Sequence, residues 1–233
     1  MKLRNVALII GLIIVADQAL KIWIKTSYGT GHVMNVLGQK WFQLYFIENP
    51  GMAWGWKLGN ETGKVVLTLF RLAAVVFGTW YLGKIVRQKY HRGFIVCAAL
   101  IYAGALGNLI DSMFYGMIFD KGLHFDPALK DYVSYSGIAA LSANGYAPFL
   151  HGSVVDMLYF PIFETRMPGW VPFAGGKEFE FFSPIFNIAD ASISIGVITL
   201  LLFQKRFFKR HKTSATQTTL ETNAEVTDKI QVL

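Results

Sequence analysis

The sequence predicts a mainly α-helical membrane protein with four transmembrane helices, a small extracytoplasmic β-sheet cradle and an enlarged second extracytoplasmic loop region. Three observations predict this fold. Of the 233 residues, 53% are hydrophobic and only 16% are charged, whereas soluble domains average about 25% charged residues. Four apolar stretches approach the roughly 20 residues that a membrane span needs. Basic residues gather beside the ends of these stretches.

The first apolar stretch, residues 6–24, is interrupted only by Asp17, Gln18 and Lys21. An apolar run after a basic start is also typical of a cleaved signal peptide, but no A-x-A cleavage site follows it. We therefore expect a retained span. The other three spans are predicted at residues 65–85, 94–113 and 188–203.

Positive charge beside the spans predicts their orientation. It is concentrated in residues 1–5, 84–92 and 205–212, which lie on one face if there are four spans. Because Lys and Arg are retained on the cytoplasmic side, both termini are predicted to be cytoplasmic. The formal charge of +7 is then mainly an orientation signal, and the basic residues do not form the aromatic-lined groove typical of nucleic-acid binding.

Two long segments, residues 26–64 and 114–186, are then extracytoplasmic. The alternation of aromatic and polar side chains in residues 41–46 predicts one or two strands on the membrane surface. The second segment far exceeds a usual connection, so we expect a helical or irregular cover that is functional or partly mobile. Residues 1–208 should form one membrane domain, and residues 209–233 a disordered cytoplasmic tail.

Carboxylates in or beside the spans need a physical reason, because an Asp at mid-span costs about 2.5–3.5 kcal/mol. Asp17 and Lys21 are four residues apart, so a structural ion pair explains them. Asn187 suits a helix N-cap and Asp190 the first turn after it. Asp156 follows β-branched residues and would by itself be interpreted as a solvated loop acid. On the third span, small and polar residues share one face: Gly104, Gly107, Asn108 and Asp111.

Several chemistries are excluded by the pattern. No histidine forms H-E-x-x-H or lies inside a predicted span, which argues against a helical zinc peptidase and a membrane Ser/His pair. With Cys97 as the single cysteine and no Gly-rich phosphate loop, neither a metal nor a cofactor is predicted. The remaining acids suffice for peptide hydrolysis, provided that two carboxyl groups share a proton.

Five short patterns follow one another along the chain: Asp17-Gln18-x-x-Lys21, Asn49-x-Gly51-x-Ala53-Trp54-Gly55, Gly104-x-x-Gly107-Asn108-x-x-Asp111, Val154-Val155-Asp156 and Phe186-Asn187-x-Ala189-Asp190-Ala191. Together they resemble the ordered motif set of bacterial lipoprotein signal peptidase, the type II signal peptidase. The resemblance implies an aspartyl protease with four membrane helices. It removes the signal peptide of diacylglyceryl-modified prolipoproteins on the amino side of the lipidated cysteine.

The resemblance also implies the site. Asp156 and Asp190 become the catalytic dyad, and substrate-binding or dyad-supporting roles are implied for Asp17, Lys21, Asn49, Gly51, Asn108, Asp111 and Asn187. The partners are prolipoprotein substrates and membrane lipid, with no nucleic acid, and the protein is expected to act as a monomer. Its location is the bacterial inner membrane, with the active site near the extracytoplasmic face.

Two features depart from the family pattern. An arginine usually follows the third-helix aspartate, whereas this chain has Ser112. Arg71 or Lys121 is a candidate replacement, although an arginine near a span end is also expected to snorkel to the interface, and snorkelling is slightly favoured for Arg71. Residues 117–150 and 164–182 are interpreted as insertions in the outer region.

Two other functions compete with the peptidase. A proton- or ion-coupled transporter would use the acids as a relay, but the acids gather near one face of the membrane rather than across its depth. A non-catalytic membrane scaffold is the second alternative, since Ser112 replaces a substrate-binding charge.

Overall fold

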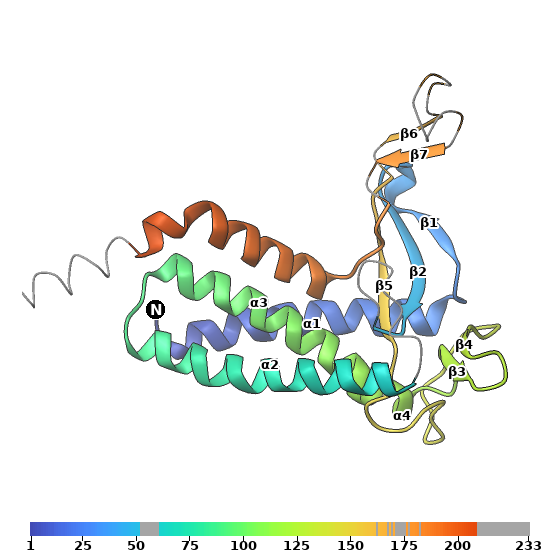
Figure 1. The fold of residues 1–233 in the computed structure, drawn as a ribbon, viewed down its shortest axis with the longest axis horizontal. Coiled ribbons are helices and arrows are strands. Elements are labelled where there is room, and N and C mark those ends of the chain that lie inside the picture. The colour runs from blue at the N-terminus through green and yellow to red at the C-terminus, as the bar shows by residue number, and fades with distance from the viewer. Residues whose placement is uncertain are drawn as a thin grey trace, which may run out of the picture.

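The computed structural model describes residues 1–51, 61–161, 163–166, 168, 170, 176, 178–181 and 183–208. Within these residues, four helices are long and apolar enough to cross a membrane (Figure 1). They are α1 (Leu3–Ser27), α2 (Glu61–Arg87), the segment Arg92–Ile118 and the C-terminal helix Ile188–Phe208. Each predicted span lies inside one of these helices, and the predicted fold class is confirmed. The expected tail, residues 209–233, lies outside the described residues.

The outward-facing side chains of the helices are apolar, as a lipid environment requires. Leu8 and Leu12 on α1 are each 62% exposed, Phe70 on α2 is 70% exposed and Leu202 on the C-terminal helix is 73% exposed. Apolar runs of this length form helices in a bilayer because a helix pairs its backbone N–H and C=O groups internally, where no water is available. The described surfaces of the spans are therefore mainly apolar, and the buried polar side chains lie toward one end of the bundle.

The third helix occupies the middle of the bundle. It comprises α3 (Arg92–Ile110), the wider turn η2 (Asp111–Tyr115) and α4 (Gly116–Ile118). A Cβ on Gly104 would lie 2.2 Å from the carbonyl oxygen of Ala189, and a Cβ on Gly196 would lie 2.9 Å from that of Cys97. Glycines on both helices thus permit a close approach, and the packing role expected of Gly104 is confirmed.

A three-stranded antiparallel sheet lies across one end of the helices, which we call the sheet end (Figure 1). Its order is β1 (Val33–Asn35), β2 (Gln43–Asn49) and β5 (Val154–Tyr159). The strand predicted from aromatic alternation is β2, which begins two residues later than residue 41. The sheet combines both long segments, since β5 comes from the second segment and pairs with β2 of the first.

The second segment is an irregular cover with short hairpins. These are β3 (His124–Asp126) with β4 (Asp131–Val133), and β6 (Phe163–Arg166) with β7 (Glu178–Phe181), while the 3-10 turn η1 (Val36–Gly38) belongs to the first segment. The described part of the first insertion folds back on the end of the third helix. Tyr146 N donates to the carbonyl oxygen of Phe119 at 2.9 Å, and Ala147 N donates to that of Gly116 at 3.0 Å. The insertion at residues 164–182 lies partly outside the described residues.

Buried apolar residues form two separate cores. One lies under the sheet and contains Phe46, Tyr115 and Met157. The other lies at the opposite end of the bundle, near residue 1, and contains Val6, Ile95 and other apolar residues. The first core sets the sheet against the helix ends, where the candidate site lies.

Candidate active site

Asp156 and Asp190 reach the same region from different elements. Asp156 lies in β5, and Asp190 lies in the first turn of the C-terminal helix. Asn187 connects them: its Nδ2 donates to Asp156 Oδ1 at 2.7 Å, and its Oδ1 accepts a hydrogen bond from Asp190 N at 2.8 Å. The second bond is the predicted N-cap. One residue thus positions both carboxyl groups.

Asn108 holds the second acid from the third helix. Its Nδ2 donates to Asp190 Oδ1 at 2.7 Å. Its Oδ1 accepts from Asn187 Nδ2 at 3.1 Å and from Lys21 Nζ at 3.0 Å. The two amides therefore form a continuous network that joins Asp156 to Asp190.

Lys21 lies between two acids beneath this network. Its Nζ is 2.8 Å from Asp17 Oδ2 and 2.8 Å from Asp111 Oδ2, and all three side chains are almost completely buried. Asp17 Oδ1 also accepts from Ala189 N at 2.9 Å. The predicted ion pair within the first span is present, and it joins α1 to the third helix and the C-terminal helix.

The turn after β2 brings Asn49 to the other oxygen of Asp156. Asn49 Nδ2 donates to Asp156 Oδ2 at 3.3 Å, and its Oδ1 accepts from Gly51 N at 2.9 Å. Gly51 has a φ of 103°, which favours glycine, and a Cβ there would lie 2.8 Å from Leu67 Cδ2. Both residues are thus suited to a tight turn beside the acid. Ala53, Trp54 and Gly55 of the same motif lie outside the described residues.

Burial changes the protonation of Asp156, which is only 3% exposed. Desolvation raises its pKa to about 7, and the negative charge of Asp190 acts in the same direction. Lys21 and the hydrogen bonds from Asn49 and Asn187 oppose this rise because they stabilise the carboxylate. Asp156 can consequently carry a proton near neutral pH.

Arg71 reaches the position where the family pattern has its arginine. Its Nη1 donates to Ser112 Oγ at 2.9 Å, and that hydroxyl donates to the carbonyl oxygen of Asn108 at 2.9 Å. The interpretation that Arg71 snorkels to the interface is wrong, because its guanidinium points into the bundle and its charge acts on Asp190. Lys121 Nζ instead lies 3.3 Å from where a Cβ on Gly137 would be.

Several polar residues that lie in the site were given no role by the sequence patterns. Gln18 Nε2 donates to Asp111 Oδ1 at 2.7 Å and Gln18 Oε1 accepts from the Tyr115 hydroxyl at 3.1 Å. Lys25 forms a buried ion pair with Glu48. The signal that could have found Lys25 is its spacing of four residues from Lys21, which places both lysines on one helix face.

The donor set favours acid chemistry over metal chemistry. Within the part of the chain that the structure describes, no group of three or more His, Cys, Asp or Glu side chains could hold a metal ion. A pair of carboxyl groups held by amides, one of them with a raised pKa, can activate water and polarise a carbonyl group by itself.

Comparisons with known proteins agree on one family. A family model described as signal peptidase (SPase) II matches residues 9–206. The chain is 47% identical over 208 residues to a lipoprotein signal peptidase of Porphyromonas gingivalis, covering 87% of this chain and 84% of that protein. It is 32% identical over 228 residues to a lipoprotein signal peptidase of Amoebophilus asiaticus, covering 94% and 88%. A solved bacterial membrane enzyme, determined by the in meso method at 2.3 Å, is similar with a TM-score of 0.53 and 25% identity over 88% of this chain and 89% of that chain.

Proposed function

The chain belongs to the signal peptidase II family, and we propose that it cleaves diacylglyceryl-modified prolipoproteins on the amino side of the lipidated cysteine, with Asp156 and Asp190 as its catalytic pair. The observation that carries the assignment of the pair is the bridging position of Asn187. Its amide holds one carboxyl group and its carbonyl oxygen fixes the helix turn that bears the other. No other pair of acids in the described residues is both joined in this way and left without a lysine partner.

The reaction needs one proton shared by the two acids. The ionised carboxylate accepts a proton from water, which attacks the peptide carbonyl, while the neutral carboxyl group donates a hydrogen bond to the oxygen that becomes negative. The amine leaves when the tetrahedral intermediate collapses and takes a proton from the pair. The raised pKa of Asp156 favours placing the shared proton on that side chain.

The residues around Asp156 and Asp190 contribute to the charge and the orientation of the pair. Lys21 forms ion pairs with both Asp17 and Asp111 at 2.8 Å each, so its positive charge offsets part of the negative charge of these buried acids. Asn108 and Asn187 can orient the carboxyl oxygens without adding charge, because both are neutral amides. Asn49 and Gly51 form the turn that faces Asp156, where we place one side of the substrate peptide.

Arg71 is proposed as the substrate-binding cation of the site. It supplies, from α2, the charge that the family pattern has at position 112. The guanidinium reaches Ser112 with one nitrogen, and its planar fork of donors suits a carbonyl or phosphate oxygen. We therefore expect Arg71 to contact the backbone or the glycerol-linked region of the substrate.

The site is proposed to face the extracytoplasmic side of the bacterial inner membrane, with both termini in the cytoplasm and the protein active as a monomer. The distribution of Lys and Arg supports this orientation. Substrate should enter sideways from the bilayer, since its signal peptide and its acyl chains are both lipid-soluble. A charge relay through the bundle finds no support, because the buried polar residues among those described all lie toward the sheet end, whereas the core at the other end is apolar.

The test is cleavage of a prolipoprotein peptide by the purified protein in detergent, with the products identified by mass spectrometry. One peptide carries a diacylglyceryl cysteine, and the control peptide is identical but unmodified. We expect the modified peptide to be cut on the amino side of the cysteine and the unmodified one to be cut far more slowly. Cleavage at another bond, or equal cleavage of both peptides, would contradict the proposed specificity.

A further inference from the structure

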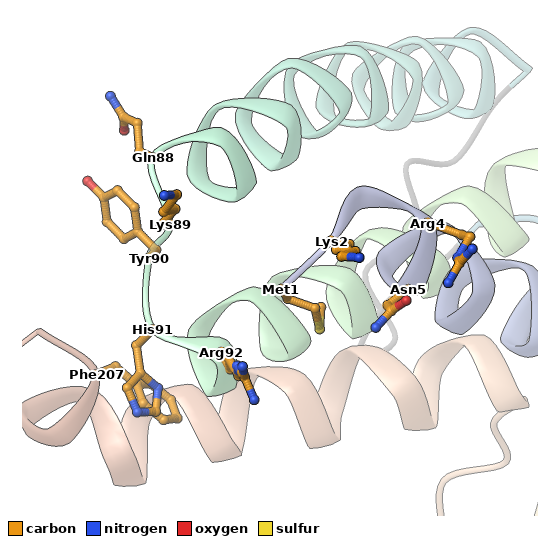
Figure 2. A pocket seen from close by; sticks show the side chains of 10 residues that line it. All are labelled: Met1, Lys2, Arg4, Asn5, Gln88, Lys89, Tyr90, His91, Arg92 and Phe207. Carbon is orange, nitrogen blue, oxygen red and sulfur yellow. The ribbon is translucent and has the colours of Figure 1, made fainter.

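A cavity of about 1160 Å³ opens at the end of the bundle opposite the sheet end (Figure 2). Its lining comes from three segments: the first residues of the chain, the loop between α2 and α3, and the last turn of the C-terminal helix. None of these residues belongs to the proposed peptidase site. The proposed cleavage reaction therefore gives this cavity no role.

Four of the ten residues that line the cavity are Lys or Arg. Lys2 and Arg4 approach from the N-terminus, and Lys89 and Arg92 from the loop, while no carboxylate lines the cavity. In the described residues, the ion pairs all lie toward the sheet end and involve other lysines. Among the residues that the structure describes, four positive charges consequently line one space in which no acid pairs with them.

Two helices also begin at this cavity. α1 starts at Leu3 and α3 at Arg92, and neither has an acidic residue in its first turn. The N-cap residue of α1, Lys2, makes no side-chain capping hydrogen bond. Helix N-termini carry partial positive charge, so their field adds to that of the four side chains.

The rest of the lining mixes polar and apolar side chains, with Met1 and Phe207 as its apolar members, and the cavity lies where the membrane-facing surface of the bundle ends. Met1 packs against the core that contains Phe207, and the Phe207 ring stacks on His91 with 5.1 Å between centroids. Phe203 and Phe208 on the same helix are 47% and 42% exposed. A ligand here would meet four cations and, at Met1 and Phe207, apolar side chains, so an amphiphilic anion fits this lining.

We propose that this cavity binds the phosphate group of an anionic phospholipid from the leaflet that meets this end of the bundle. The four cations contact the phosphate and its headgroup, and the apolar side contacts the first part of an acyl chain. A volume slightly above the usual range of ligand cavities accommodates a headgroup with its glycerol unit. Charges that only set orientation would need no such cavity.

The experiment measures lipid binding to the purified, delipidated full-length protein in a neutral detergent by native mass spectrometry. The probes are phosphatidylglycerol, zwitterionic phosphatidylcholine and inorganic phosphate. A cavity variant carries Lys2→Gln, Arg4→Gln, Lys89→Gln and Arg92→Gln. The matched control carries Lys84→Gln, Arg87→Gln, Lys205→Gln and Arg206→Gln, four exposed cations at the same end that do not line the cavity.

We expect saturable binding of phosphatidylglycerol that the cavity variant weakens about tenfold or more, whereas the control changes it by less than about threefold, because each nearby cation adds to the attraction. An equal loss in both variants would show diffuse surface attraction and overturn the site. Equal binding of phosphatidylcholine, or displacement of the lipid by inorganic phosphate at the same concentration, would overturn the choice of ligand.

A second measurement uses the unaltered protein and so does not depend on the folding of a variant. Photoreactive phosphatidylglycerol is added to the protein in neutral detergent, and the labelled peptides are identified after illumination. Labels should concentrate in residues 1–5 and 88–92. Labels spread along the outer surfaces of the four helices, with no excess at these segments, would contradict the proposal.

Discussion

Asn49 and Asn187 control how readily Asp156 loses its proton, because both donate to its carboxylate. Burial nevertheless raises the pKa of Asp156 to about 7. If the catalytic pair must hold one proton, activity falls as pH rises through this pKa. The pH profile of kcat/KM should therefore have a basic limb near pH 7.

The same reasoning predicts the direction in which a substitution moves that limb. Asn49→Ala removes a hydrogen bond that stabilises the ionised form, so the pKa of Asp156 should rise and the limb should move to higher pH. Gln43→Ala, from the same strand, is the control and should leave the limb in place. A limb that moves to lower pH in Asn49→Ala would contradict this account of the acid.

The proposal that Arg71 supplies the charge expected at position 112 can be tested by exchanging the two residues. Arg71→Ser should raise KM for the lipid-modified peptide and lower kcat/KM by about tenfold to a hundredfold, since a charge-assisted contact contributes about 1.5–3 kcal/mol. The double variant Arg71→Ser with Ser112→Arg returns the cation to the position of the family pattern. It should recover a substantial part of the lost activity.

The measurement is steady-state cleavage by the parent, the single variant and the double variant, with melting temperatures recorded to establish folding. Lys121→Ser is the matched control, because this cation lies in the cover, and it should cleave at the parent rate. Unchanged cleavage by Arg71→Ser would remove Arg71 from the site. Equal inactivity of the single and double variants would show that the positions of the two residues are not interchangeable.

At the scale of elements, the buried Glu48 connects both α1 and the inserted cover to the cradle. Lys25 on α1 contacts Glu48 on β2, and the Tyr135 hydroxyl donates to Glu48 Oε1 at 2.7 Å. Leu123 N donates to the other carboxylate oxygen at 2.9 Å. Glu48 therefore links the insertion to the strand that carries Asn49.

Removing one member of this pair should be more harmful than removing both. Lys25→Met leaves Glu48 buried and unpaired, which costs about 3–5 kcal/mol, whereas Lys25→Met with Glu48→Leu should lose much less. Thermal unfolding of the two variants in detergent checks the order. Hydrogen exchange in residues 119–146 should also rise in the double variant, because Tyr135 and Leu123 lose their acceptor on Glu48. A double variant less stable than the single one would contradict this role.

The four helices and the Asn187 cap can be predicted from the sequence, because each depends on residues that are close together in the chain. The four helices are recognisable because spanning segments must be apolar over their whole length. The capping role of Asn187 is recognisable because an N-cap acts within a few residues of sequence. The meeting of Asp156 with Asp190 came only through the resemblance, since it depends on pairing between strands from two segments about a hundred residues apart.

Other features left no local signal. The wider turn η2 (Asp111–Tyr115) has no proline or glycine pair to mark it. Arg71 and Ser112 lie on different helices, and only the folded bundle brings them together. The cover also lacks a local sequence signal, because its ordered structure depends on contacts with Glu48 and the third helix rather than on regular structure of its own.

For the whole molecule, the orientation in the membrane is the largest untested prediction. Leu129, in the turn between β3 and β4, is 67% exposed, and Gln88 lies in the exposed loop at the opposite end. Leu129→Cys should react with an impermeant maleimide added to spheroplasts. Gln88→Cys should react only after the membrane is permeabilised. Cys97 is buried and should not react in either case. The reverse pattern would place the dyad on the cytoplasmic side.

The central claim is that Asp156 and Asp190 act together as the catalytic pair, and single-turnover cleavage of the diacylglyceryl-modified peptide tests it most directly. The proteins compared are the parent, Asp156→Asn, Asp190→Asn and the control Asp131→Asn, whose carboxylate lies in the exposed hairpin of the cover. We expect both dyad variants to fold and to bind the peptide, and to lose several orders of magnitude in cleavage rate, while Asp131→Asn keeps the parent rate. A folded dyad variant that cleaves near the parent rate would contradict the account.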